Sequence, residues 1–393
     1  MPIFITGGTG FLGVNLVREL VARGHKVRLL VRPGSSRVDL TSDLIEFAAG
    51  DVTDPASIRR AVDGCCEVYH LAAWVQVSPW GRRAAWQVNV EGTRTICSAA
   101  LSAGVRRLVH TSSIATIAAG TLDEPADEAA PWNLRAAHVP YYETKLEAEK
   151  VVLEHVERGL DAVIVNPTYL VGPWDVKPSA GRMLIAMATG RLRVHPKDGG
   201  INFVDVRRAV AGHLLAMDHG RSGQRYILGG ENLSFGSFAA RVDSVTNASI
   251  RRWALPHAVA YLPAAVGSLG GRLFPDVFRD VNLSVLHSAY LEHFVSSAKA
   301  CRELSYKTAA IDRAIEDALG WFVDHGYMIA PAGWAPGDRS QWEAAAKTPP
   351  PSVNQAPAPS PRSAPPQKAA DRRPEPETEN ARTPGLAGRE PQV

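Results

Sequence analysis

The sequence is poor in several residue types and patterns, and each shortage excludes a class of protein. Its 393 residues include only four cysteines, Cys65, Cys66, Cys97 and Cys301, and their spacing matches no metal-ligand pattern. We therefore expect reduced, mostly buried thiols in a cytoplasmic protein, and no metal site. No stretch reaches the roughly eighteen consecutive apolar residues of a transmembrane helix.

An excess of charge of one sign is also missing. Lys and Arg total 43 against 40 Asp and Glu, and no basic run with interleaved aromatics predicts a nucleic-acid partner. The chain starts with an apolar strand, so we expect no signal peptide. The apolar stretch Ala254 to Leu269 contains Pro256 and Pro263. This stretch fits a helix pair or lid of a substrate domain, and alternatively an apolar surface for a lipid-like substrate or a membrane.

The N-terminus combines a short strand, a glycine-rich loop and a helix. Apolar residues 1–6 are followed by glycine at positions 7, 10 and 13. In such a loop Gly7 permits a tight turn, Gly10 lets a pyrophosphate approach the backbone, and Gly13 lets the helix pack closely on the strand. The helix N-terminus offers free N–H groups and a positive dipole end to phosphates. The pattern predicts a nucleotide-binding βαβ unit.

Strand and helix patterns alternate through the first half, which predicts a Rossmann-type, doubly wound parallel sheet covered on both faces. The expected strands after the first are 27–31, 45–47, 68–71, 107–111, 162–165 and 224–228, and the expected helices are 85–103, 141–158, 207–219 and 311–325. We place the dinucleotide-binding domain at 1–167, with elements of about 200–230 returning to it. A smaller substrate-binding domain covers mainly 168–330. Residues 331–393 are rich in Pro and Ala, and we expect a disordered tail.

A second group of residues suits proton transfer. Tyr141 and Lys145 are four positions apart on one expected helix, so their side chains share a face. Ser113 follows the expected strand 107–111, at the sheet edge where open α/β sheets bind ligands. Hydride transfer at a carbinol carbon needs a group that moves the hydroxyl proton. We expect the charge of Lys145 to lower the pKa of Tyr141 for this task, and Ser113 to orient the substrate oxygen.

With these motifs the chain resembles an extended short-chain dehydrogenase/reductase of the NAD-dependent epimerase/dehydratase superfamily. The matching segments are Thr6–Gly13, Gly50–Asp54, His70–Ala73, Asn89–Thr93, Thr111–Ser113 and Tyr141–Lys145. The resemblance implies that Ser113, Tyr141 and Lys145 are catalytic. It gives Asn89 a structural or proton-relay role. The cofactor-binding residues that it implies are Gly7, Gly10, Phe11, Leu12, Gly13, Arg32, Asp51, Val52, Leu71, Ala72, Ala73, Tyr141, Lys145 and Pro167.

The second half is similar to the dihydroflavonol-4-reductase-like and hopanoid-associated sugar epimerase-like branch. The segments Asn166–Thr168, Phe203–Arg207, Tyr226–Asn232 and Phe294–Ala300 carry this likeness, which extends to about residue 330. Arg208 departs from it, because these relatives commonly have an acidic residue there. We expect Arg208 to be exposed, with a changed contact between the two domains as the alternative. Members of this family often dimerise, so the resemblance also implies a homodimer as one arrangement.

The residue after the second strand bears on the cofactor. NAD-preferring relatives usually carry Asp or Glu there, whereas this chain has Arg32, which suits the 2′-phosphate of NADP. Ser35 or Arg37 could assist. We therefore expect NADP, with NAD as the alternative if Arg32 is a solvated loop charge.

Three functions remain open from the sequence: an NADPH-dependent reductase of a ketone or aldehyde, a nucleotide-sugar epimerase or dehydratase with tightly held NAD, and a cofactor-sensing binding protein. The intact Ser113, Tyr141 and Lys145 disfavour the third. A broad apolar pocket wall would come from Trp74, Trp80, Trp132 and Trp174, unless these only fill the core. Cations at Lys177, Arg182, Arg191 and Arg193 could grip a diphosphate, or could be surface charges.

Overall fold

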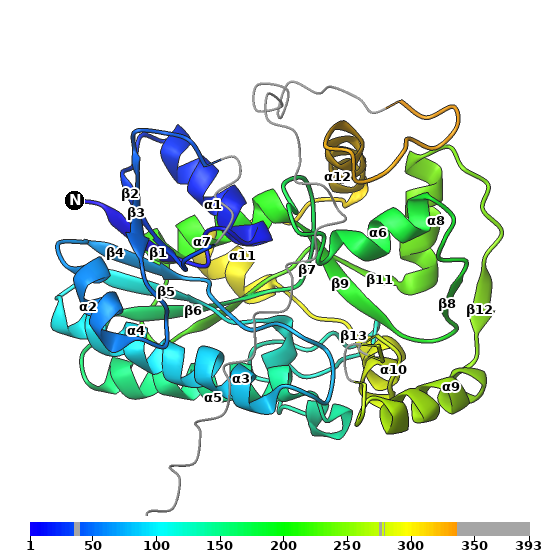
Figure 1. Cartoon of the computed structure of the whole chain (residues 1–393), viewed down its shortest axis with the longest axis horizontal. Coiled ribbons are helices and arrows are strands. Elements are labelled where there is room, and N and C mark those ends of the chain that lie inside the picture. The colour runs from blue at the N-terminus through cyan, green and yellow to red at the C-terminus, as the bar shows by residue number, and fades with distance from the viewer. Residues whose placement is uncertain (35–39, 275–276, 279, 336–393) are drawn as a thin grey trace, which may run out of the picture. The chain divides into compact units, whose positions relative to one another are not determined.

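A seven-stranded, all-parallel sheet forms the centre of the computed structural model, which describes residues 1–34, 40–274, 277–278 and 280–335 (Figure 1). All of these belong to one compact unit within Met1–Pro350. The sheet order is β3-β2-β1-β4-β5-β6-β10. Its strands are β1 (Ile3–Thr6), β2 (Val27–Val31), β3 (Ile45–Ala49), β4 (Glu67–His70), β5 (Arg107–Thr111), β6 (Ala162–Pro167) and β10 (Arg225–Leu228). This order is that of a Rossmann-type sheet, which confirms the predicted fold class.

Helices cover both faces of this sheet. Successive side chains of a strand point to opposite faces, and apolar side chains on the two faces form two separate cores. Ile5 and Val109 point into the core beneath α1 (Phe11–Ala22) and α7 (Val206–His219). Phe4 and Leu108 point into the core beneath α2 (Pro55–Val62), α4 (Gly92–Ser102) and α5 (Pro140–Glu157). The two sets of helices lie above and below the sheet in Figure 1. Burial on both faces is the reason that the central strands read as nearly continuous apolar runs.

The predicted helix 85–103 is divided in the structure. It consists of α3 (Arg82–Ala85), a π-helical segment at Trp86–Glu91 and then α4. The π-helical segment carries the buried Asn89, and π-helical turns of this kind are frequent at functional sites. Short 3₁₀ helices at Ile114–Thr116 and Leu134–Ala137 lie in the loop between β5 and α5.

Beyond β6 the chain builds a smaller set of elements, and two of them return to the central sheet. A small sheet combines β7 (Tyr169–Val171), β9 (Gly200–Asp205), β11 (Glu231–Ser234) and β13 (Glu292–His293). The helices here are α6 (Gly181–Ala188), α8 (Phe235–Val245), α9 (His257–Gly270), α10 (Leu283–Ala289), α11 (Ala298–Leu304) and α12 (Asp312–Asp324), and β8 (Val194–Pro196) pairs with β12 (Trp253–Leu255). Within residues 200–230, α7 packs on the central sheet and β10 extends it, whereas β9 belongs to the small sheet.

A partly buried ion cluster links these later elements. Arg207, the second residue of α7, binds Asp205 at 2.7 Å and Asp317 of α12 at 2.6 Å. Arg208 next to it is exposed, as expected. The boundaries 1–167 and 168–330 remain a prediction, and residues 336–393 of the expected tail lie outside the described residues, as do Ser35 and Arg37.

The described residues include no helix that combines the length and the apolarity needed to cross a membrane. Within the same ranges, no three His, Cys, Asp or Glu side chains are grouped so as to hold a metal ion. All four cysteines are free thiols. The expectation of mostly buried thiols holds for Cys65 and Cys97, whereas Cys66 is half-buried and Cys301 is exposed.

Candidate active site

The carboxyl edge of the sheet brings the glycine-rich loop against the loop that follows β4. β1 lies between β2 and β4, so the chain changes direction across the sheet at this point. Gly7 has a positive φ of 73°, and a Cβ there would lie 2.6 Å from the backbone nitrogen of Ala72. A Cβ on Gly13 would lie 2.2 Å from the carbonyl oxygen of Gly7. These two glycines are therefore required by close backbone contacts.

Gly10 differs from its two neighbours in the motif. The nearest atom to a Cβ on Gly10 is the carbonyl oxygen of Gly7 at 3.3 Å, and the backbone there is ordinary and extended. Gly10 caps α1 without a side-chain hydrogen bond, so the first N–H groups of the helix, beginning at Phe11 and Leu12, can meet an anion. The loop expected to hold a pyrophosphate is thus less crowded at Gly10 than at Gly7 and Gly13.

The other expected cofactor residues also follow the carboxyl ends of strands. Asp51 comes after β3, and its Oδ1 accepts hydrogen bonds from the backbone nitrogen and hydroxyl of Thr53 at 2.9 and 2.7 Å. Val52 is buried, Leu71–Ala73 are half-buried directly after β4, and Pro167 is the last residue of β6. Arg32 follows β2 and is exposed. All of them therefore lie along one edge, as a bound dinucleotide requires.

Ser113, Tyr141 and Lys145 come together at the same edge, beyond β5. Lys145 is buried on α5, and its Nζ donates a hydrogen bond of 2.6 Å to the carbonyl oxygen of Thr111, the last residue of β5. Ser113 follows two residues later, and its hydroxyl lies close enough to the Tyr141 hydroxyl to favour the deprotonated form of Tyr141. The i,i+4 spacing on α5 puts Tyr141 and Lys145 on the face that meets β5.

Burial dominates the pKa values of this group. It raises the pKa of Tyr141 to about 12, and the nearby Ser113 hydroxyl opposes that rise. It lowers the pKa of Lys145 to about 8, against the favourable charge of Glu149. The expectation of a lowered Tyr141 pKa is thus wrong for this structure, because desolvation of the phenolate outweighs any stabilisation by nearby charge.

A buried polar network lies behind Lys145. It was not predicted from the sequence. Glu149 lies one turn further along α5, and its Oε1 accepts hydrogen bonds from Thr116 Oγ1 at 2.6 Å and Asn166 Nδ2 at 2.8 Å. Its other oxygen pairs with Arg225 of β10 at 3.0 Å. Asn166 Nδ2 also lies 3.1 Å from the carbonyl oxygen of Ser113. The network therefore ties Ser113 to α5. The i,i+4 spacing from Lys145 is the one sequence signal that could have found Glu149.

Asn89 has a structural position. Its Oδ1 accepts a hydrogen bond of 2.7 Å from the backbone nitrogen of Trp74. Its Nδ2 donates to the carbonyl oxygen of Trp74 and to Thr144 Oγ1, both at 3.0 Å. Asn89 thereby fixes the loop after β4 against α5, and of the two roles considered for it these contacts match the structural one.

Two of the four expected tryptophans, Trp132 and Trp174, have different positions in the structure. Trp132 packs against the same small apolar cluster as Tyr141 and donates a hydrogen bond of 3.0 Å to the carbonyl oxygen of Ala115. Trp174 is instead buried against Trp321, with the Arg18 guanidinium 3.8 Å from its ring centre. Trp174 therefore belongs to the core.

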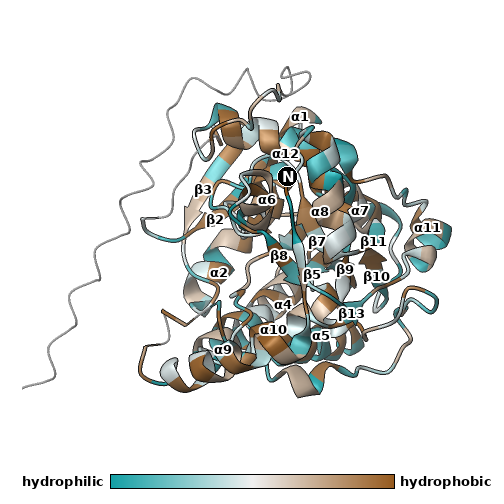
Figure 2. Ribbon diagram, turned by 90° about the vertical axis from the view of Figure 1, so that its right-hand side faces the viewer, coloured by the Kyte–Doolittle hydropathy of each residue, from teal (hydrophilic) through white to brown (hydrophobic). Residues whose placement is uncertain are grey.

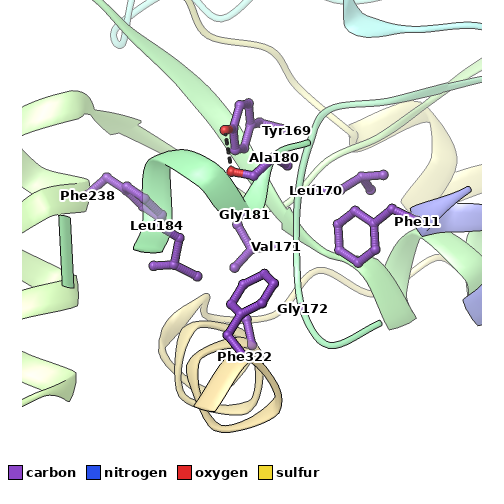
Figure 3. Close-up of a pocket in the computed structure, with 11 residues that line it drawn as sticks. Phe11, Tyr169, Leu170, Val171, Gly172, Ala180, Gly181, Leu184, Phe238 and Phe322 are labelled. Carbon is purple, nitrogen blue, oxygen red and sulfur yellow. Dashed lines mark hydrogen bonds between the residues drawn. The ribbon is translucent and has the colours of Figure 1, made fainter. Parts of the chain in front are cut away.

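A small, mostly apolar pocket links the glycine-rich loop with the later elements (Figure 3). Its lining comes from α1, β7, α6, α8 and α12 and comprises Phe11, Tyr169, Leu170, Val171, Gly172, Ala180, Gly181, Leu184, Phe238, Ala318 and Phe322. In the close-up, Tyr169 turns its hydroxyl to the carbonyl oxygen of Ala180, at 2.9 Å. The other side chains that line the pocket are apolar. Those from α8 and α12 were not predicted, because they lie more than two hundred residues from Phe11.

The cations considered for a diphosphate do not converge. Lys177, Arg182, Arg191 and Arg193 are all exposed. Arg182 lies 3.6 Å from Asp280, and Arg193 donates to the carbonyl oxygen of Gly190 at 3.0 Å. Their arrangement is that of surface charges.

Comparisons with known proteins agree with this geometry. The family model of the NAD dependent epimerase/dehydratase family matches residues 3–229. A relative from Synechocystis sp., "Putative dihydroflavonol 4-reductase", is 34% identical over 331 residues, covering 83% of this chain and 95% of its own length. "Sterol demethylase protein B" of Methylococcus capsulatus is 36% identical over 332 residues, covering 84% and 100%.

Solved structures give the same result. The structure of gox2253 is 36% identical with a TM-score of 0.74, and the match covers 83% of this chain and 99% of that one. A nucleoside-diphosphate-sugar epimerase from Pseudomonas aeruginosa is 26% identical with a TM-score of 0.67, covering 84% and 99%. The chain therefore belongs to the NAD dependent epimerase/dehydratase family and is an oxidoreductase-type enzyme of that superfamily.

Proposed function

We propose that this enzyme reduces a ketone or aldehyde at the expense of NADPH, with Ser113, Tyr141 and Lys145 as its catalytic residues. The observation that carries the proposal is the position of Ser113 and Tyr141 beside the buried Lys145, whose Nζ binds the carbonyl oxygen of Thr111 at 2.6 Å, at the edge that also holds the glycine-rich loop. Reduction of a carbonyl needs a proton donor next to its oxygen. The protonation state of Tyr141 fits that direction of reaction.

Each residue of the site has its own part in the proton transfer. With a pKa of about 12, Tyr141 keeps its proton at neutral pH and can donate it to the carbonyl oxygen as negative charge develops there. Ser113 orients the same oxygen by a hydrogen bond. Lys145, with a pKa of about 8, is charged at neutral pH and stabilises the phenolate that Tyr141 becomes. A bound reduced nicotinamide supplies the hydride.

The residues that would hold the cofactor fit a dinucleotide. Gly7 and Gly13 are held in close backbone contacts, and the less crowded Gly10 leaves room for the pyrophosphate at the start of α1. Asp51 and Val52 would flank the adenine, and Leu71–Ala73 and Pro167 would line the cleft. The exposed Arg32 is available for the 2′-phosphate of NADP.

Two observations favour reduction over the alternative, a nucleotide-sugar epimerase or dehydratase that keeps NAD bound. The four cations considered for a sugar diphosphate are exposed and dispersed. The names of several relatives point to apolar carbonyl compounds or alcohols, among them the putative dihydroflavonol reductase, the sterol demethylase protein and a farnesyl-dihydroquinoline-oxide ketoreductase of Stigmatella aurantiaca. Because these relatives are named for apolar compounds, we infer that the substrate is a lipophilic ketone or aldehyde.

The proposal is tested by identifying the cofactor. Freshly purified protein is denatured, released nucleotide is quantified, and stripped protein is titrated with NADPH and NADH. We expect little released NAD and a preference for NADPH of about tenfold or more, which Arg32→Glu abolishes. Arg208→Glu, an exposed arginine outside the site, serves as the control and should change neither affinity. Stoichiometric NAD in the purified protein would instead support the epimerase.

A further inference from the structure

An apolar surface is concentrated in one part of the structure. Among the described residues, more than half of the exposed large apolar side chains fall between residues 253 and 281. Five of them form what we call the α9 stripe: Val259, Leu262, Val266, Leu269 and Leu273, which are between 58% and 78% exposed. The α9 helix is correspondingly brown along the lower edge of Figure 2. Isolated exposed apolar residues are ordinary, but a contiguous group indicates an interaction surface.

Four members of the α9 stripe lie within the helix, and Leu273 lies in the turn that follows it. Intervals of three and four residues put the four helical members on a single face of α9. The opposite face packs inward: Ala264 and Gly267 are buried, and a Cβ on Gly267 would lie 1.8 Å from the carbonyl oxygen of Val281. The helix therefore cannot rotate to hide its apolar face. Residues 257–270 also contain no Asp, Glu, Lys or Arg, so the exposed face has no charge of its own.

Basic residues border this uncharged helix at both ends. The β8–β12 ribbon leads directly into α9, and its exposed Val194 and Trp253 are paired across the two strands. The exposed Arg193 and Arg251 flank that pair, and the Arg251 guanidinium lies 5.7 Å from the centre of the Trp253 ring. Arg272 is exposed at the other end of α9. We call these three arginines the basic rim. A tryptophan and cations around an apolar face suit the interface of a bilayer with anionic headgroups.

The same surface adjoins the proposed active site through α10. Tyr142, the neighbour of Tyr141, donates a hydrogen bond of 3.1 Å to Ser288 of α10. Leu291, just after α10, packs in the same apolar cluster as Tyr141. α10 in turn packs against α9. Thus the exposed apolar helix is joined to the substrate side of the molecule.

Two other occupants fit this surface less well. Residues 336–393 contain only Trp342, Val353, Leu386 and Val393 as large apolar residues, too few and too scattered to cover the α9 stripe. A second copy docked through the same face would bring two basic rims together, and like charges repel. A lipid surface satisfies both the apolar stripe and the basic rim.

We propose that the α9 stripe and the basic rim dock this protein on the surface of an anionic lipid bilayer, with α9 lying in the plane of the interface. The stripe supplies the apolar contact that enters the headgroup region, and the arginines meet lipid phosphates. The proposal goes beyond the proposed reaction and does not depend on it, since binding to vesicles is measured without substrate or turnover.

The test is flotation of the full-length protein with vesicles of phosphatidylcholine alone and of phosphatidylcholine mixed with phosphatidylglycerol. We expect binding to the mixed vesicles that is weaker in high salt. The triple variant Leu262→Gln/Val266→Gln/Leu269→Gln should lose about tenfold or more of that binding. The control Leu122→Gln/Ile329→Gln replaces two apolar residues that are at least as exposed as Val266 but lie elsewhere, and should bind as wild type does.

Circular dichroism and light scattering of all three proteins complete the test. Unchanged folding and a monodisperse protein of one mass, together with selective loss of vesicle binding in the triple variant, would support the proposal. Wild-type protein that floats with neither vesicle would overturn it, as would equal binding by wild type and triple variant. A wild-type dimer that the triple variant converts to monomer, without vesicle binding, would assign the surface to a second copy instead.

Discussion

Lys145 is a charged side chain in a buried setting, and Glu149 is the charge that favours its protonated form. Burial lowers the pKa of Lys145 to about 8, and the nearby carboxylate opposes that change. Since Glu149 is itself held by Thr116, Asn166 and Arg225, it cannot turn away from Lys145 without breaking buried hydrogen bonds. We therefore regard Glu149 as a residue that positions and supports Lys145.

Glu149→Gln should lower the pH at which carbonyl reduction declines. Lys145 is charged below its pKa of about 8, so turnover should fall as the pH rises through that value. Removal of the Glu149 charge disfavours protonated Lys145 and should move the decline to lower pH by about one unit. The measurement is kcat against pH.

Glu147→Gln is the control, because Glu147 lies on the same helix but forms an exposed pair with Lys150 at 2.7 Å. Its pH profile should match that of wild type. Identical profiles for Glu147→Gln and Glu149→Gln would show that Glu149 has no influence on Lys145.

At the level of secondary-structure elements, Gly10 and Gly13, at the junction of β1 and α1, have different roles. A methyl group on Gly13 would meet the backbone of Gly7 and Gly8, whereas one on Gly10 would meet no atom closer than 3.3 Å. Gly13 therefore serves the contact of helix with strand, and Gly10 faces the space where a phosphate would approach.

Gly13→Ala should therefore mainly lower stability, whereas Gly10→Ala should mainly weaken dinucleotide binding. We expect Gly13→Ala to lower the free energy of unfolding by about 1–3 kcal/mol, because the backbone must move to admit the methyl group. Gly10→Ala should change it by less than about 1 kcal/mol but weaken dinucleotide binding by about tenfold or more. Urea unfolding and cofactor titration separate the two effects. Equal loss of stability in both variants would contradict this division.

The strands of the central sheet could be predicted closely because they are buried on both faces and read as apolar runs. The observed β2 and β5 match the expected ranges 27–31 and 107–111. The juxtaposition of Ser113, Tyr141 and Lys145 was also predictable, since strand order and helix periodicity both bring them to one edge.

The parts that could not be predicted depend on contacts between distant residues. Arg225 meets Glu149 across 76 positions, and Trp174 packs on Trp321 in the core, which no local pattern indicates. The pKa of Tyr141 was predicted in the wrong direction because the sequence does not report the extent of burial. The apolar stretch Ala254 to Leu269 had two readings, and the structure resolves it into β12 and the single exposed helix α9.

For the molecule as a whole, buried neutral histidines predict sensitivity to acid. Burial lowers the pKa of His70 to about 3 and of His213 and His293 to about 4, and that of His110 is also well below its usual value. Below pH 6.5 the unfolded chain binds protons that the folded chain does not, so stability falls as the pH falls. Each group contributes a loss of up to about 1.4 kcal/mol per pH unit.

Urea unfolding at pH 7, 6 and 5 measures this loss. His213→Gln should reduce the slope of stability against pH, whatever its effect at pH 7, because one such group is removed. His25→Gln, at an exposed position, should leave the slope unchanged. A wild-type stability that is constant from pH 7 to pH 5 would show that these histidines are not neutral and buried.

Tyr141, the proposed proton donor of the reduction, is followed by a second tyrosine on α5, and the pair allows a matched test. Tyr141→Phe removes the proposed donor, whereas Tyr142→Phe removes only the hydrogen bond to Ser288. Turnover of NADPH with a lipophilic ketone is measured for both, together with NADPH affinity. We predict that Tyr141→Phe lowers kcat by a factor of about 10²–10⁴ while NADPH still binds, and that Tyr142→Phe stays within severalfold of wild type. Equal activity of the two variants would contradict the account.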